Sequence, residues 1–236
     1  MKVKSYNTTI AELSKVELPI QTISYKPINH LSVIDSIKEQ IDKKNIVISS
    51  EIYKSNSNGN QLTGEFRFKS NLDKDIDLSL IFQNSYDKSM SFKLVSGFWT
   101  YCCKNGQCYG DLGTFKRRHV GEIQSLTPIN IIKQLDSVEQ EFDKAIVLKN
   151  KLKETEITKR TVAELIGRLY HEQELLQTTQ LSILKQEMDT PQFDYGVENT
   201  AWNLYSNITH SYKQLHPRLY IEQNSKLSNF FIEEFS

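Results

Sequence analysis

The chain has 236 residues, 38% of them hydrophobic, and a formal net charge of zero, because 29 Lys and Arg balance 29 Asp and Glu. This length and apolar content suit one sizeable domain or two small ones and exclude a chain too polar to form a core. Residues 1–130 carry 17 basic and 13 acidic residues and residues 131–236 carry 12 and 16, so the halves have charges of +4 and −4. That modest difference permits a polyanionic partner for the first half without requiring one.

The three cysteines, Cys102, Cys103 and Cys108, lie within seven residues of one another. An odd, clustered set is a poor disulfide framework, and adjacent cysteines suit a tetrahedral metal site badly even with His119 as a fourth ligand. We therefore expect reduced thiols, no metal and no other cofactor. The sequence shows no signal-like segment and no apolar run of membrane-spanning length, so we expect a soluble protein of a host bacterial cytoplasm with no membrane partner.

The first elements in chain order are an arm and a helix. Residues 1–29 are polar and contain Pro19 and Pro27, which predicts an extended arm or a short edge strand and no helix. Leu31, Ile34, Ile37 and Ile41 then recur at helical spacing, so residues 30–44 are expected to form an amphipathic helix.

Alternating apolar residues follow and predict half-buried strands, at Ile46/Ile48, Leu62/Phe66/Phe68, Ile76/Leu78/Leu80/Phe82 and Met90/Phe92/Leu94. Turn-forming residues separate these runs, and Asn105-Gly106 is the signal of a tight hairpin. The simplest topology is an antiparallel meander that packs on the helix at residues 30–44.

After Pro128 the apolar period becomes helical. It predicts a helix from there to about residue 150, another from Thr158 or Thr161 to Asp189, and a last one at about 197–215, before His216-Pro217. The predicted fold class is α+β, with a single domain at 30–236 whose sheet part is about 46–127 and whose helical part is about 128–215.

Three short motifs resemble those of a known family in content and in order: Asn84–Ser89 (NSYDKS), Cys103–Gly106 (CKNG) and Lys116–Gly121 (KRRHVG). Near the end, Thr200–Tyr205 (TAWNLY) with Thr209 resembles the closing helix of the same family. The family is the phage- and plasmid-like domain of unknown function 932, and the resemblance spans roughly residues 30–225. It implies a phage or mobile-element setting in replication, recombination or host takeover, and it implies no particular activity.

The densest chemical signal is a block of aromatic and basic residues. Residues 81–120 hold eight aromatic side chains and six Lys or Arg against two acids. Bases of single-stranded nucleic acid stack on aromatic rings while cations follow the phosphates. The candidate nucleic-acid-binding residues are Tyr86, Lys88, Trp99, Tyr101, Lys104, Tyr109, Lys116, Arg117, Arg118 and His119. Alternation instead places Phe82, Phe92 and Phe98 in the core, and a solvated loop is the competing interpretation of the Lys116–His119 run.

No arrangement of nucleophile, base or paired carboxylates indicates catalysis, although Asp87, Asp111 and His119 could converge in the fold. We therefore expect a protein that is not an enzyme and that binds single-stranded DNA in phage replication or recombination, compatible with a homo-oligomer. The alternative is a protein-interaction or anti-defence protein that uses the helices at 129–215. The tail at residues 229–236 combines acids with phenylalanines, which indicates either a partner-binding tip or a terminal element docked in the core.

Overall fold

The fold is described from a computed structural model, which covers residues 6–69, 73–100, 105–108, 114–117 and 123–235. Within these residues one antiparallel sheet runs in the order β1-β2-β3-β4-β5-β6, and β7 also pairs with β5. The strands are β1 (Asn7–Thr8), β2 (Ile48–Ser55), β3 (Gln61–Phe68), β4 (Ile76–Ser85), β5 (Phe92–Thr100), β6 (Asn105–Cys108) and β7 (Thr114–Arg117). The predicted meander is confirmed for β2 to β5.

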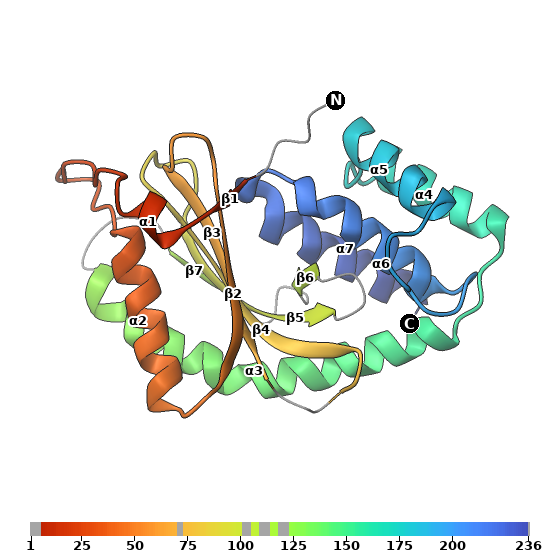
Figure 1. Cartoon of the computed structure of the whole chain (residues 1–236), viewed down its shortest axis with the longest axis horizontal. Helices are drawn as coiled ribbons and strands as arrows, with labels where there is room; N and C mark the ends of the chain where they lie inside the picture. The colour runs from red at the N-terminus through yellow and green to blue at the C-terminus, as the bar shows by residue number, and fades with distance from the viewer. Residues whose placement is uncertain (1–5, 70–72, 101–104, 109–113, 118–122, 236) are drawn as a thin grey trace.

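Helices precede and follow this sheet, so the fold class is α+β as predicted (Figure 1). They are α1 (Ile10–Leu13), α2 (His30–Lys43), α3 (Ile123–Glu154), α4 (Lys159–His171), α5 (Thr178–Asp189), α6 (Ala201–Ser211) and α7 (Tyr220–Phe235), with short 3-10 turns η1 (Tyr212–Gln214) and η2 (Pro217–Leu219). The long α3 runs along the sheet and continues beneath the C-terminal helices. It therefore joins the two parts of the molecule.

One face of the sheet is apolar and is covered by α2 and α3. Phe66, Phe82 and Phe92 on this face are at most 1% exposed and belong to one cluster with Ile37 and Ile41 of α2. Helix α2 begins after Asn29, whose Oδ1 accepts hydrogen bonds from the backbone N–H groups of Leu31 (2.8 Å) and Ser32 (3.2 Å). The apolar stripe read from the sequence thus packs where the alternation of the strands requires it.

The opposite face, which we call the polar face, consists in its middle of Thr63, Glu65, Arg67, Asp77, Ser79 and Gln83. These side chains are buried, as are those on the apolar face, so both faces of β3 and β4 are covered. The prediction of half-buried strands is therefore wrong for these two strands. The reason is a second layer: Thr63 Oγ1 and Gln83 Nε2 donate hydrogen bonds to the carbonyl of Pro217 in η2, at 2.9 and 2.6 Å. Beside them, Ile81 and Val95 pack against the first turn of α7.

Of the two expectations for residues 1–29, the short edge strand is found at β1, and an extended arm is wrong for residues 6–29, which also include the helix α1. Strand β1 pairs with β2, α1 has a capping box made by Thr9 and Glu12, and Leu13 and Ile28 join the main core. Residues 1–5 lie outside the described part of the chain. The prolines were compatible with this path, because they bend the chain without preventing local pairing.

Two other boundaries differ from expectation. Asn105 and Gly106 are strand residues of β6, paired with Thr100 and Trp99, and do not form a turn. The helix expected from about 158 to 189 is two helices, because Glu174 adopts a φ of +52° and the N–H groups of Leu175 and Leu176 return to the carbonyl of Leu169. The burial of those two leucines, at 3% and 2% exposed, supports the break. Helix α3 likewise begins at Ile123, before Pro128.

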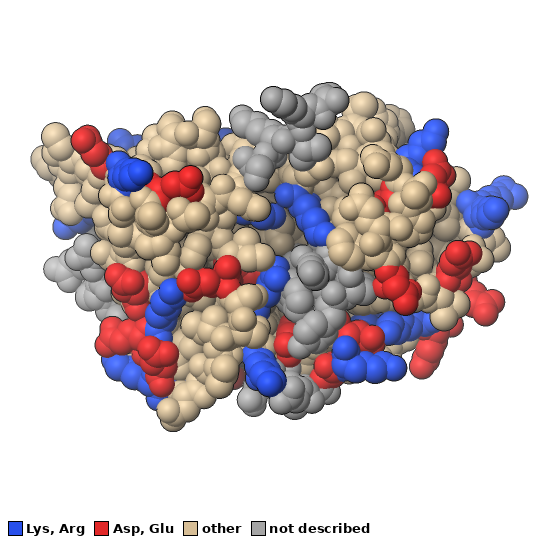
Figure 2. All heavy atoms as spheres, in the orientation of Figure 1, with Lys and Arg blue, Asp and Glu red and all other residues tan. Residues whose placement is uncertain are grey.

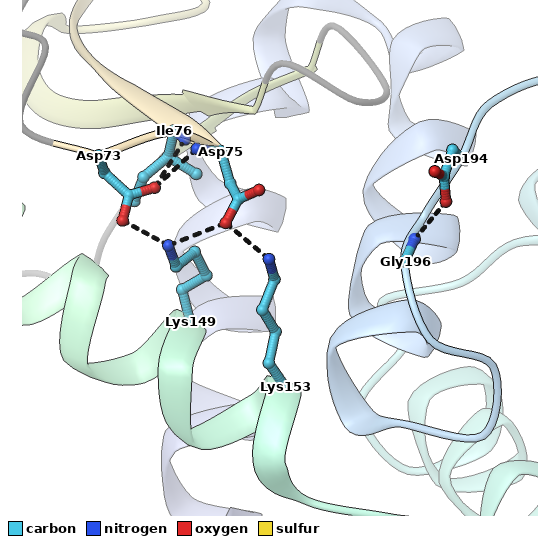
Figure 3. Close-up of polar contacts among 7 residues, drawn as sticks. All are labelled: Asp73, Asp75, Ile76, Lys149, Lys153, Asp194 and Gly196. Atoms are coloured by element: carbon cyan, nitrogen blue, oxygen red, sulfur yellow. Dashed lines mark hydrogen bonds and ion pairs between the residues drawn. The ribbon is translucent and has the colours of Figure 1, made fainter.

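An ion-pair cluster fixes the start of β4 to α3 (Figure 3). Lys149 Nζ lies 2.5 Å from Asp73 Oδ2 and 3.1 Å from Asp75 Oδ2, and Lys153 Nζ lies 2.6 Å from the same Asp75 oxygen. Burial alone would raise the pKa of both aspartates, but hydrogen bonds from the lysines, joined at Asp73 by those from the backbone N–H groups of Asp75 and Ile76, outweigh it and lower the pKa of each. Opposite charges fully satisfied at this junction indicate a structural clamp between the sheet and α3.

The chain ends in α7, whose aromatic residues are docked. Phe231 is 0% exposed and meets the Tyr205 ring edge-to-face at 4.9 Å, while Tyr205 Oη is 2.8 Å from Ser228 Oγ. Of the two interpretations of the tail, the docked element is confirmed for Phe230 and Phe231. A partner-binding tip built on those two rings is wrong, because both are buried in the core.

Candidate nucleic-acid interface

The structure describes the predicted binding residues unevenly. Tyr101, Lys104, Tyr109, Arg118 and His119 lie outside the described residues, as do Cys102, Cys103 and Asp111. Trp99 and Arg117 are placed by their backbones alone: Trp99 pairs with Asp77 and Gly106, and Arg117 pairs with Phe92. Tyr86, Lys88 and Lys116 are described in full.

Tyr86 is 4% exposed and cannot offer its ring to a base, so its prediction as a stacking residue is wrong. Its ring stacks on His30 at 3.9 Å with an interplanar angle of 7°, and its hydroxyl accepts a hydrogen bond of 2.8 Å from the His30 backbone N–H. His30 Nε2 in turn lies 3.0 Å from the Gly59 carbonyl and its Nδ1 lies 2.9 Å from Asn84 Nδ2. Tyr86 thereby fixes the start of α2 to the end of β4.

Other residues of the Asn84–Ser89 motif also make contacts within the fold. Asp87 accepts a hydrogen bond of 2.7 Å from Gln61 Nε2 and another of 3.0 Å from the Ser89 backbone N–H. Burial would raise the pKa of Asp87, but hydrogen bonds from Ser89 and Gln61 lower it overall. Lys88 is exposed, has a φ of +62° and places its Nζ 4.8 Å from the centre of the Tyr25 ring. Its role in contacting phosphate stays a prediction.

Lys116 lies on a basic edge that the structure assembles from three elements. Strand pairing sets Lys116 of β7 directly opposite Lys93 of β5, and Glu222 in the first turn of α7 is close enough for both lysines to lower its pKa. The largest cause of that lowering is the hydrogen bond from Lys226, whose Nζ lies 2.8 Å from Glu222 Oε1; burial opposes it. We call Lys93, Lys116 and Lys226 the lysine edge.

The lysine edge brings basic side chains from three elements close to the Glu222 carboxylate. Lys116 and Lys93 occupy directly opposed strand positions, where like charges repel each other and a nearby anion reduces the repulsion. Lys116 is exposed and the Lys226 side chain is 57% exposed, so a phosphate can reach both. On the face shown in Figure 2, basic and acidic side chains are intermixed over the periphery.

The buried polar face holds the lysine edge in place. Glu65 and Arg67 form an ion pair at 3.1 Å with both side chains 7% exposed, and the hydrogen bonds of Thr63 and Gln83 to Pro217 anchor η2 immediately before α7. Lys54 Nζ lies 4.6 Å from the centre of the Tyr220 ring and 3.4 Å from the Lys213 carbonyl. Together these contacts fix the first turn of α7 over the sheet, which sets the position of Glu222 and Lys226.

Sequence reasoning missed Lys226 and Glu222 and did not select Lys93. The glutamate and lysine are four residues apart, which is the spacing of a helical ion pair, but the helix that contains them was not predicted. Lys93 is brought next to Lys116 only by the pairing of β5 with β7, which are not consecutive strands. Alternation within a strand carries no information on such a pairing.

No group of three or more His, Cys, Asp or Glu side chains within the described ranges is arranged to hold a metal ion. None of the helices, as far as the structure describes them, combines the length and apolar character that crossing a membrane requires.

Comparisons with known proteins agree with the motifs noted above. The model of the family described as "Domain of unknown function (DUF932)" matches residues 20–228. No curated protein and no solved structure matches the chain. Since the family match covers α2, the whole sheet from β2 and the helices up to the middle of α7, the chain belongs to the domain of unknown function family DUF932.

Proposed function

We propose that this protein binds single-stranded DNA without catalysing a reaction, as a component of phage replication or recombination. The observation that supports this best is the lysine edge, where Lys93, Lys116 and Lys226 from three separate elements meet around one carboxylate. The Lys116–His119 run continues from that edge in the sequence. A local cluster of cations attracts phosphates even when the chain as a whole is neutral.

Base stacking is assigned to residues other than Tyr86. Trp99, Tyr101 and Tyr109 stay candidates from the sequence, and β5, which contains Trp99, is also the strand that carries Lys93. Stacking of a base on an aromatic ring contributes about 1–3 kcal/mol and tolerates every base. Binding by this combination is expected to depend strongly on salt and weakly on sequence.

The test is a salt titration of binding to a fluorescent single-stranded oligo-dT. We expect Lys116→Gln and Lys226→Gln each to flatten the slope of log affinity against log salt by about 0.7, the amount for one lost phosphate contact. Lys43→Gln is the matched control, because Lys43 forms an (i, i+4) pair with Glu39 on α2, at 2.6 Å and 60% exposed, on the apolar side of the sheet. It should leave the slope unchanged.

Trp99→Ala separates stacking from charge. Loss of one stacked base should weaken binding about five- to 100-fold at fixed salt and leave the slope as it is in the wild type. Circular dichroism checks that each variant is folded. Absence of wild-type binding at low salt would contradict the proposal. Equal slopes for Lys116→Gln, Lys226→Gln and Lys43→Gln would refute the lysine edge as the site.

The alternative, a protein-interaction function, has one observation in its favour. Ile23 is 105% exposed in the loop closed by the Thr22–Tyr25 bridge, and Ile20, just before that loop, is 89% exposed, whereas extended apolar patches on a surface often mark interaction sites. This loop, rather than the helices at 129–215, is then the surface to consider if DNA binding is absent.

A further inference from the structure

A pocket of about 900 Å³ lies among α5, the end of α6, η2 and the N-terminal segment. Its wall is rich in uncharged polar side chains, namely those of Gln177, Thr178, Gln180, Gln186, Gln192 and Gln214. Ile183, Leu215 and Leu219 add an apolar portion. Its volume is in the range of pockets that enclose a small organic ligand.

The charged groups of this pocket are balanced internally. Among the described residues that line it there is no Lys or Arg, and Glu187 is the single carboxylate. Glu187 Oε1 accepts hydrogen bonds from the Tyr195 hydroxyl (2.6 Å) and the Gln192 backbone N–H (2.7 Å), and Oε2 faces His210 Nε2 at 3.7 Å. Lys213 Nζ, 3.3 Å from His210 Nδ1, supplies the balancing positive charge. Such a pocket has no unbalanced charge with which to select an ion.

One wall group still lacks a partner. Gln180 is 3% exposed, and its Oε1 accepts no hydrogen bond from the described part of the chain. A buried acceptor without a donor is costly, so native proteins rarely keep one. Less than 1 Å² of this oxygen is accessible, so the Gln180 amide must turn toward the pocket that the residue lines before a bound N–H donor can satisfy it.

We propose that the pocket binds an uncharged heterocycle that presents an N–H donor, the chemistry of a nucleobase in a nucleoside. The heterocycle N–H donates to Gln180 Oε1, the ring lies against Ile183 and Leu219, and the glutamine and threonine side chains receive the sugar hydroxyls. A phosphorylated ligand is disfavoured, because the described wall offers it no cation and contains the Glu187 carboxylate. The proposal uses none of the residues of the lysine edge and stands independently of DNA binding.

The experiment is ligand-observed NMR with adenosine, guanosine, cytidine and uridine, each compared with its 5′-monophosphate, followed by titration of the tightest nucleoside. We expect at least one nucleoside to bind the full chain, and its monophosphate to bind less tightly. Gln180→Leu should weaken binding about five- to 100-fold, because the ligand donor then loses its acceptor. Gln173→Leu, at an exposed position that does not line the pocket, should bind as the wild type does.

Thermal unfolding gives a second readout. Gln180→Leu removes the unpaired oxygen and should not lower the melting temperature of the ligand-free protein, whereas the nucleoside should raise that of the wild type more than that of the variant. If Gln180→Leu fails to fold, Ile183→Trp fills the same pocket and should abolish binding. The proposal is overturned if no nucleoside binds the wild type, if the monophosphates bind more tightly, or if the folded pocket variants bind as the wild type does.

Discussion

Burial in the fold changes the protonation of Lys54. It extends from β2 over the polar face, where burial lowers its pKa to about 8, Glu65 opposes the lowering, and Arg67 and Lys213 add to it. Between this value and the ordinary pKa of about 10.5, the unfolded chain binds a proton at Lys54 that the folded chain does not. The contribution of Lys54 to the free energy of unfolding therefore rises with pH across that window.

We predict that urea unfolding of the wild type shows this rise between pH 8 and pH 10, and that Lys54→Met removes part of it. Below about pH 8 the lysine is charged in both states and contributes no slope. Lys43→Met, which alters an exposed lysine on α2, should keep the wild-type profile. A Lys54→Met profile parallel to that of the wild type would show that the folded state holds this ammonium at its ordinary pKa.

Individual residues also show what alternation can predict. Phe82, Phe92 and Phe98 were expected in the core and are at most 1% exposed, because the apolar face of a strand is legible from period two. Tyr86 follows the end of β4, where the strand period stops, and its burial depends on His30, 56 positions away in the sequence. No local pattern encodes such a partner.

At the scale of elements, the pairing of β3 with β4 depends on a glycine. Gly64 lies opposite Phe82, and a Cβ atom at Gly64 would come within 2.1 Å of the Phe82 ring. The ring fills this place and also stacks on Phe66 at 5.9 Å. Close packing of two strands over an aromatic ring is thus possible only without a side chain at position 64.

We predict that Gly64→Ala lowers the free energy of unfolding by about 1–3 kcal/mol, the usual cost of overpacking a core. The matched change Gly167→Ala, in α4 where a Cβ would meet nothing within 4 Å, should raise it by about 0.5–1 kcal/mol through helix propensity. Denaturant unfolding of both variants measures the contrast. Similar effects from the two substitutions would mean that Phe82 moves aside without cost.

Elements differed in how far the sequence could predict them. Strands β3 to β5 and helix α2 were predictable because each has an apolar face of regular period. Of β2, the predicted run Ile46/Ile48 reached only the first residue, because Ser49 to Glu51 break the apolar alternation. The pairing of β7 with β5 was not, since it passes over β6 in the chain order. The lysine edge depends on that pairing and on α7, so only Lys116 of its residues was selected beforehand.

At the scale of the whole molecule, α7 packs its buried aromatic residues into the main core. We predict that Phe231→Ala lowers the free energy of unfolding by about 3–5 kcal/mol, as expected for a fully buried phenylalanine, and that Glu233→Ala on the exposed side of α7 changes it little. Thermal or denaturant unfolding measures both. Near-wild-type stability of Phe231→Ala would show that the helix does not dock in solution.

Whole-molecule layering was the part least accessible from sequence. Asp77, Ser79 and Gln83 alternate with apolar residues along β4, which is the pattern of a strand with one face in water. They are nevertheless at most 2% exposed, because η2 and the helices around it cover them. The polar residues of a strand show which face of the sheet does not pack against the hydrophobic core. They do not show whether another layer of the protein covers that face.

The chemistry of the two sheet faces also suits the order in which a ribosome delivers the chain. Helix α2 emerges before β2 to β7 and α3 directly after them, so the apolar face can be covered as soon as the sheet is complete. The face that waits for α7, the last of these helices to emerge, is hydrophilic in its middle, and its described apolar side chains include Ile52, Ile81 and Val95. Until α7 has emerged, the nascent chain therefore exposes a mainly hydrophilic sheet face and not a hydrophobic one, which limits association with neighbouring chains.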